Sequence, residues 1–80
     1  MQEVRISVFP PNTDLPEGIR YSLCIVDLES GEVILLYDVH RGKSHHRHLR
    51  GAETQYDFVD EHMLLDDFFH DVTLILEGKL

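Results

Sequence analysis

The chain has 80 residues, with 15 Asp and Glu against 7 Lys and Arg, and a formal net charge of −8 when its 6 His are counted as neutral. A chain of this length forms a single domain, residues 1–80, which can bury only about two thirds of its unfolded surface. The single cysteine excludes an intramolecular disulfide, and the acidic balance argues against a general nucleic-acid binder, because such proteins usually have a domain-wide basic surface.

A domain this small is marginally stable without a metal, a disulfide or a partner, so association is expected. The first residues contain an early acid and then Pro10-Pro11, which does not fit the apolar core of a signal peptide. The longest apolar run, residues 33–37, is far too short to span a membrane. These features predict a cytoplasmic protein with no membrane partner, and they leave a homodimer open.

Apolar residues in the first 58 positions are patterned for β-strands. Near the amino end they alternate with polar residues, as in a half-buried strand, and Pro10 ends this pattern. The turn at residues 29–32 contains a glycine that is free to take positive φ, which favours a β-hairpin over residues 19–39. The predicted strands cover residues 2–9, 19–26 and 33–37, and shorter ones are expected at 45–50 and 54–58.

The last segment has the period of an amphipathic helix. Asp60 is the expected N-cap and Gly78 the expected stop. The side chains expected to face the sheet are Leu65, Phe68, Phe69, Val72 and Leu76. The side chains expected on the opposite face are Asp66, Asp67, His70 and Asp71. The predicted fold class is α+β, with a small antiparallel sheet of four to five strands and one C-terminal helix packed on one face.

A basic segment, residues 40–50, interrupts the acidic chain. It contains four of the six histidines, four of the seven Lys and Arg, and no acidic residue. A charge that changes sign over a few residues can orient an anionic ligand, and imidazoles as a class titrate near neutrality. The segment is therefore the candidate functional region.

Several motifs occur in a fixed order around this segment. Tyr37-Asp38 precedes a glycine-containing loop and His45-His46-Arg47-His48, and these are followed by Glu53, Tyr56, Phe58, Leu64-Leu65, Asp67-Phe68 and Val72. Over about residues 20–72, this order resembles the TumE family of toxins from bacterial and archaeal toxin-antitoxin modules. The resemblance implies a small cytoplasmic toxin encoded beside a DNA-binding antitoxin, and it implies no particular reaction.

His46 and His48 are the candidate catalytic pair. Cleavage of RNA without a metal needs a base for the 2′-hydroxyl proton, an acid for the leaving oxygen and a cation for the phosphorane. Asp38 is the third candidate, because a carboxylate that ends a strand beside this segment can orient an imidazole. The structural alternative for Asp38 is a turn acid that caps loop amides. A metal-independent ribonuclease is thus one hypothesis.

Other residues are candidates for contact with RNA or with a protein partner. Guanidinium and ammonium groups contact phosphates, and an aromatic ring can stack on an unpaired base. The candidate contact residues are His45, Arg47, Arg50, Arg41, Lys43, Tyr37 and Tyr56. The alternative for the basic residues is a solvated loop or a contact with an acidic neighbour.

A metal site is the remaining possibility for the histidines. On a strand, His46 and His48 would point to the same side, but two ligands do not make a site. Asp38, His40 or Glu53 would have to complete the shell, and the neighbouring arginines would repel a cation. No metal and no other cofactor is therefore expected.

The preferred interpretation is the toxin component of a type II toxin-antitoxin module. It would act on RNA or the translation machinery through a His/Arg-rich loop, and a cognate DNA-binding antitoxin would cover that loop. The alternative is a noncatalytic adaptor or regulator that docks an acidic partner through the same loop.

Overall fold

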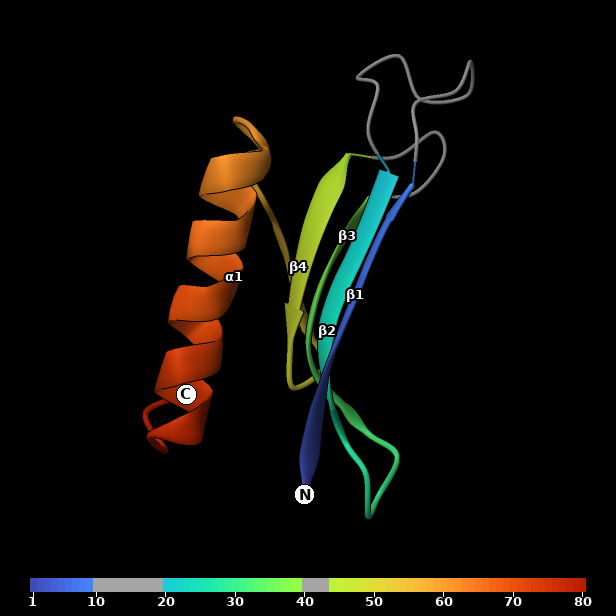
Figure 1. The fold of residues 1–80 in the computed structure, drawn as a ribbon, viewed down its shortest axis with the longest axis vertical. Helices are drawn as coiled ribbons and strands as arrows, with labels where there is room; N and C mark the ends of the chain where they lie inside the picture. Colours follow the sequence, from blue (N-terminus) through green and yellow to red (C-terminus); the bar gives the residue numbers. More distant parts are fainter. Residues whose placement is uncertain (10–19, 40–43) are drawn as a thin grey trace.

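The computed structural model describes residues 1–9, 20–39 and 44–80, which form one antiparallel five-stranded sheet and one helix (Figure 1). The strands lie side by side in chain order, from β1 at one edge to β5 at the other. The elements are β1 (Gln2–Phe9), β2 (Arg20–Asp27), β3 (Val33–Val39), β4 (His45–Leu49), β5 (Ala52–Gln55) and α1 (Glu61–Leu76). The predicted α+β class is confirmed.

The turn between β4 and β5 decides where the last strand begins. Arg50 and Gly51 form a two-residue connection in which both residues have positive φ, 48° and 86°. This backbone geometry matches the twist of a tight hairpin, so pairing resumes at once after Gly51. β5 therefore begins at Ala52 and ends at Gln55, and the fifth strand expected at 54–58 was placed too far along the chain.

The ends of α1 follow from the backbone groups that each end leaves exposed. The side chain of Asp60 accepts a hydrogen bond of 2.8 Å from the amide of Met63, which satisfies one of the free N–H groups of the first turn. Gly78 has a φ of 74° just after the last turn, where the left-handed conformation ends helices. The predicted N-cap and stop are confirmed, and the helix continues through the β-branched residues near its end.

The face that α1 turns to the sheet differs from the predicted one. Its buried residues are Leu64, Phe68, Asp71, Val72 and Ile75. Phe69 and Leu76 are 45% and 68% exposed, so their expected burial was wrong, as was the expected exposure of Asp71. The helix has two neighbouring apolar stripes, and one of them is selected by the hydrogen bonds from Arg47 of β4 to Asp71 and from Tyr56, which follows β5, to Asp67.

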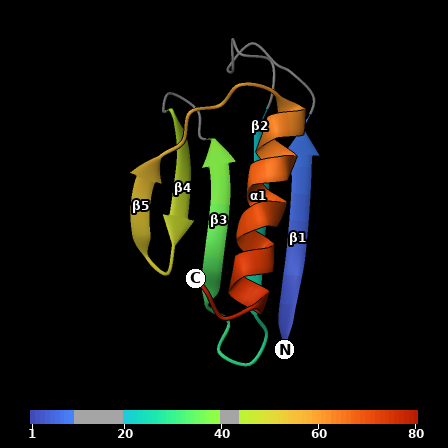
Figure 2. The same ribbon diagram turned by 90° about the vertical axis from the view of Figure 1, so that its left-hand side faces the viewer.

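The core lies between α1 and one face of the sheet. Figure 2 shows α1 running along β2, between β3 and β1. The buried cluster is formed by Tyr21, Leu23, Ile25, Ile34, Leu35, Tyr37 and Val39 of the sheet and Leu64, Phe68, Val72 and Ile75 of the helix. On the described part of the chain, no other helix or strand covers the opposite face of the sheet, which is called the outer face below.

Strand alternation assigns each residue of the sheet to one of these two faces. Residues that oppose each other in the register share a face, so the pairs Ser22↔Asp38 and Asp38↔His46 place these side chains together. The outer face contains Glu3, Arg5 and Ser7 of β1, Ser22 and Cys24 of β2, Leu36 and Asp38 of β3, His46 and His48 of β4, and Glu53 and Gln55 of β5.

Two adjacent phenylalanines test the orientation of α1. Phe68 is 0% exposed and Phe69 is 45% exposed. Phe68→Ala removes a fully enclosed ring and should lower the free energy of unfolding by about 3–5 kcal/mol, whereas Phe69→Ala should lower it by about 1 kcal/mol or less. Urea titration followed by circular dichroism measures both. Equal losses would show that the helix is rotated relative to the orientation described here.

Candidate functional site

His46 and His48 lie next to each other on the outer face. They are alternate residues of β4, so their rings project to the same side, with centroids 6.3 Å apart. Glu53 of β5 opposes His48 in the register and reaches both rings. Its Oε1 atom is 3.1 Å from Nδ1 of His46 and 3.8 Å from Nε2 of His48. Both histidines are partly exposed, so a ligand can reach the pair.

Asp38 joins this pair from the neighbouring strand. It opposes His46 in the register, and its Oδ1 atom is 3.7 Å from Nε2 of His48. The two atoms are close enough for an electrostatic interaction but too far apart for a hydrogen bond. The Asp38 side chain is buried, while Glu53 is exposed. The structure therefore brings together the three predicted catalytic residues and adds Glu53, whose Oε1 atom is 3.1 Å from Nδ1 of His46.

The position of Glu53 follows from the turn between β4 and β5. A two-residue connection at Arg50-Gly51 fixes a register in which His48 opposes Glu53 and His46 opposes Gln55. Arg50 gives no sequence signal for positive φ, because only Gly, Asn and Asp favour that conformation. The sequence alone therefore presents Glu53 as a motif residue of the family resemblance and as a candidate metal ligand, and it does not predict the contact with His46.

The described ranges 1–9, 20–39 and 44–80 contain no group of three His, Cys, Asp or Glu side chains arranged to hold a metal ion. His40, one of the residues considered as a further ligand, lies outside these ranges, as do Arg41 and Lys43. The imidazoles of His46 and His48 are groups that can transfer protons and form hydrogen bonds.

Arg47 and Tyr37 lie on the opposite side of the sheet, under α1. Nε of Arg47 donates to Oδ2 of Asp71 at 2.8 Å, and the hydroxyl of Tyr37 donates to the same oxygen at 2.5 Å. Burial raises the pKa of the Tyr37 phenol, and its hydrogen bond to Asp71 raises it further. The hydrogen bond to Asp71 also raises the pKa of Arg47. These two predicted contact residues thus connect the sheet to the helix.

His45 and Tyr56 also have intramolecular contacts. His45 is buried, with Nδ1 2.8 Å from the hydroxyl of Tyr21 and its ring stacked on Phe58 at a centroid distance of 4.6 Å. The hydroxyl of Tyr56 donates to Oδ2 of Asp67 at 2.6 Å. Burial raises the pKa of Tyr56, and the hydrogen bond to Asp67 adds to this effect. Their predicted contacts with a ligand stay predictions.

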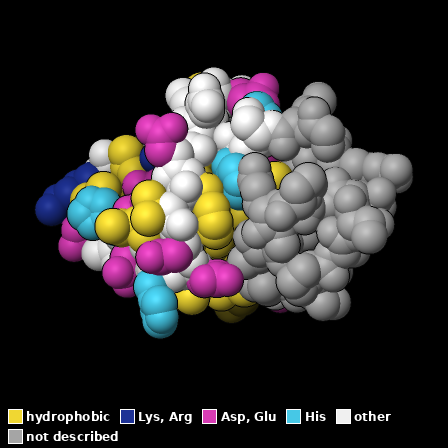
Figure 3. All heavy atoms as spheres, turned by 90° about the horizontal axis from the view of Figure 1, so that it is seen from above, with side chains coloured by type: hydrophobic (Ala, Val, Ile, Leu, Met, Phe, Trp, Pro, Cys, Tyr) yellow, Lys and Arg dark blue, Asp and Glu magenta, His cyan; other side chains and the backbone are white. Residues whose placement is uncertain are grey.

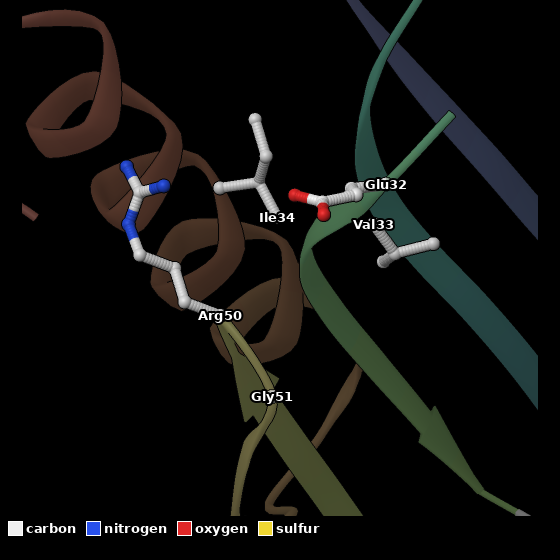
Figure 4. Close-up of a pocket in the computed structure, with 5 residues that line it drawn as sticks. All are labelled: Glu32, Val33, Ile34, Arg50 and Gly51. Carbon is white, nitrogen blue, oxygen red and sulfur yellow. The ribbon is translucent and has the colours of Figure 1, made fainter. Parts of the chain in front are cut away.

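Arg50 lies away from the histidine pair, at the turn between β4 and β5. Its Nη2 atom donates to the carbonyl of Leu80 at 3.0 Å. The side chain lines a surface pocket together with Glu32, Val33, Ile34 and Gly51, and Figure 4 shows Arg50 and Glu32 on either side of Ile34. None of the predicted catalytic residues lines this pocket. A contact between Arg50 and a ligand would be separate from the site on the outer face.

Acidic residues outnumber basic ones in the sequence, with 15 Asp and Glu against 7 Lys and Arg. Seen from above, Figure 3 shows Asp and Glu side chains spread among apolar and His side chains, with few Lys or Arg. Of the basic segment, the described residues His45 and Arg47 point under the helix, while His46 and His48 point to the outer face. The side chains of β4, the strand that this segment contributes, are therefore divided between the two faces of the sheet.

A sequence model of the family described as Toxin TumE matches residues 1–76. The chain belongs to the TumE toxin family. No curated protein and no solved structure matches it. Membership of the TumE family gives the chain a toxin role and implies an antitoxin as partner. The match also includes β1, which lies outside the region over which the sequence motifs resemble this family. None of the helices in the described ranges is long and apolar enough to cross a membrane.

Removing the Asp71 carboxylate from its group with Arg47 and Tyr37 should destabilise the fold. Asp71 is 8% exposed, so Asp71→Ala leaves a poorly hydrated guanidinium and a phenol without their acceptor. We expect the free energy of unfolding to fall by about 2–3 kcal/mol. The matched control is Asp66→Ala on the exposed side of the same helix, which should change it by about 0.5 kcal/mol or less. Similar effects of the two substitutions in urea titrations would contradict this role for Asp71.

The two hydrogen-bonded phenols predict a loss of stability at alkaline pH. The pKa values of Tyr37 and Tyr56 are raised above the ordinary value of 10.0, so the folded protein retains these protons after the unfolded chain has released them. The contribution of these two protonated phenols to the free energy of unfolding is fully present below pH 10.0 and is lost as the pH rises above it. Tyrosinate absorbance should rise later in the native protein than in denaturant, and Tyr56→Phe should remove one of the late transitions. Coincident titration curves would refute this prediction.

Proposed function

We propose that this chain is the toxin of a type II toxin-antitoxin module and that it acts on RNA, free or within the translation machinery, through His46 and His48. The toxin role follows from membership of the TumE family. The observation that supports the RNA target is the pair of partly exposed imidazoles on the outer face, each close to a carboxylate. Such a pair is suited to moving protons at a phosphodiester.

The proposed reaction is a metal-independent cleavage in which one imidazole acts as base and the other as acid. Glu53 lies against Nδ1 of His46, which leaves Nε2 of that ring for the 2′-hydroxyl. Asp38 and Glu53 lie near Nε2 of His48, which leaves its Nδ1 for the leaving oxygen. Ring centroids 6.3 Å apart leave space for a group that is hydrogen-bonded to both rings at about 2.6–3.2 Å.

Charge restricts the proposed contact to a small area. The two carboxylates beside the histidines repel a phosphate, so attraction has to come from protonated imidazoles and from nearby cations. Arg41 and Lys43 belong to the segment that joins β3 to β4 and are close in sequence to the pair. In this proposal they supply the cationic contact to the phosphates, while Arg47 holds the helix in place.

The proposed antitoxin is a DNA-binding protein that covers the outer face. On the described part of the chain, no secondary-structure element of the toxin covers this face. A partner seated there would block His46 and His48 without disturbing the core on the other side of the sheet. Neutralisation would then be steric and reversible.

Expression in a bacterial host that lacks the antitoxin tests the proposal. Wild-type protein should arrest growth, and His46→Ala or His48→Ala should abolish the arrest, because each removes one proton-transfer group. The matched controls are His62→Ala and His70→Ala, which change exposed histidines of α1 and should leave the arrest unchanged. With a single-stranded RNA substrate in vitro, each site variant should reduce the cleavage rate by about 10²–10⁴-fold.

Three results would contradict different parts of the proposal. Harmless overexpression of the folded wild-type protein would refute the toxin proposal. Growth arrest that persists in a double His46→Ala/His48→Ala variant would refute the assigned site. Arrest that requires both histidines without any RNA cleavage, together with a stable complex with an acidic protein, would replace the catalytic proposal by the noncatalytic docking role.

A further inference from the structure

β1 forms an edge of the sheet that is longer and more apolar than the other edge. It has 8 residues, whereas β5 has 4 residues that are all exposed and mostly polar. On the described ranges, β1 pairs only with β2. A long edge strand presents free N–H and C=O groups and is a template for pairing with another strand.

The hydrogen bonds to β2 identify which residues of β1 turn their backbone outward. The amide of Leu28 donates to the carbonyl of Met1 at 2.8 Å, and the register of β1 on β2 continues from this pair. In an antiparallel ladder, hydrogen-bonded pairs alternate along the strand, so the odd-numbered residues of β1 face β2. Gln2, Val4 and Ile6 therefore direct their N–H and C=O groups to the free edge.

The side chains of β1 are suited to a second strand. Val4 and Ile6 lie on the helix side and are 43% and 47% exposed, which leaves apolar surface beside the core. Phe69, on the flank of α1 away from Asp67 and Asp71, is also nearly half exposed. On the outer face, Nε of Arg5 is 2.6 Å from Oε2 of Glu3. The edge thus combines an apolar side with one acid and one base.

Charge selects one register for the pairing of two copies of β1. Outward-facing residues must pair with outward-facing residues, which permits antiparallel registers centred on Glu3, Val4, Arg5 or Ile6. The registers centred on Glu3 and Arg5 oppose like charges, and the register centred on Ile6 forms no ion pair. The register centred on Val4 opposes Glu3 to the partner's Arg5 twice, at the closely spaced positions of the ladder.

We propose that this protein forms a two-fold symmetric dimer in which β1 pairs antiparallel with β1 of a second copy, centred on Val4. The pairing makes one continuous sheet from both copies, with both helices on the same face. Backbone hydrogen bonds join Val4 to the partner's Val4 and Gln2 to the partner's Ile6. The two ion pairs between Glu3 and Arg5, one within each copy, are exchanged for two ion pairs across the interface.

A charge swap tests this register in the purified protein. Sedimentation equilibrium of the wild type should show a dimer. Glu3→Arg and Arg5→Glu each place like charges opposite each other at two symmetric positions and should weaken the dimer by about tenfold or more. The double variant Glu3→Arg/Arg5→Glu restores opposite charges and should return the dissociation constant to within about threefold of the wild type.

Val4→Pro provides a second test, because proline removes the N–H that bonds the partner while the bonds from β1 to β2 remain. This variant should be monomeric and should keep the wild-type circular dichroism spectrum. A wild type that stays monomeric at about 100 µM, or single charge variants that dimerise as tightly as the wild type, would overturn the proposal. So would a charge swap that fails to restore the dimer. The free edge of β1 could instead pair with a strand of the antitoxin. The toxin would then be a monomer, and its binding to the antitoxin would depend on Glu3. This result would also overturn the proposed dimer.

Discussion

A hydrogen-bonded group of Arg47, Tyr37 and Asp71 fixes how the helix sits on the sheet. Its three members come from β4, β3 and α1, and both donors share one carboxylate oxygen. Removing charged groups from water is costly unless each finds its partner, so the arrangement tolerates little rotation of the helix. Leu64, Phe68 and Ile75 are buried as a consequence, and the apolar side chains of the adjacent stripe stay at the surface.

Strand alternation then divides the His and Arg side chains of β4 between two roles. His45 and Arg47 point under the helix, where they stabilise the packing of α1 and of Phe58. His46 and His48 point to the other side, where Asp38 and Glu53 of the neighbouring strands approach them. The site is therefore a pair of imidazoles flanked by carboxylates, and the proposed function assigns proton transfer to this pair.

The proposed pairing through β1 is compatible with the proposed site. β1 is an edge of the sheet and β4 is its fourth strand, so the dimer contact and the histidine pair are separated by the width of β2 and β3. The two-fold axis of such a dimer lies perpendicular to the sheet, which would leave both histidine pairs on the same outer face. An antitoxin that covers this face could contact both sites at once.

The sequence by itself determined the architecture. Period-two apolar alternation, Pro10 and the glycine at the β2–β3 turn are local signals, and they placed the first three strands and the class of the fold. Asp60 and Gly78 set the ends of the helix for the same reason, because capping depends on neighbouring backbone groups. The ordered motifs around the histidines also indicated the toxin family.

Only the tertiary structure decided which side chains meet. The positive φ of Arg50 fixed the register of β5 and brought Glu53 to the histidines, although arginine gives no local signal for that conformation. The orientation of α1 on the sheet depended on the hydrogen bond between Arg47 and Asp71, which are 24 residues apart in the sequence. Asp71, predicted to lie on the surface, is buried as a result. Long-range pairing of polar groups is invisible to periodicity, because periodicity records only the polarity of each residue and not the partner it finds.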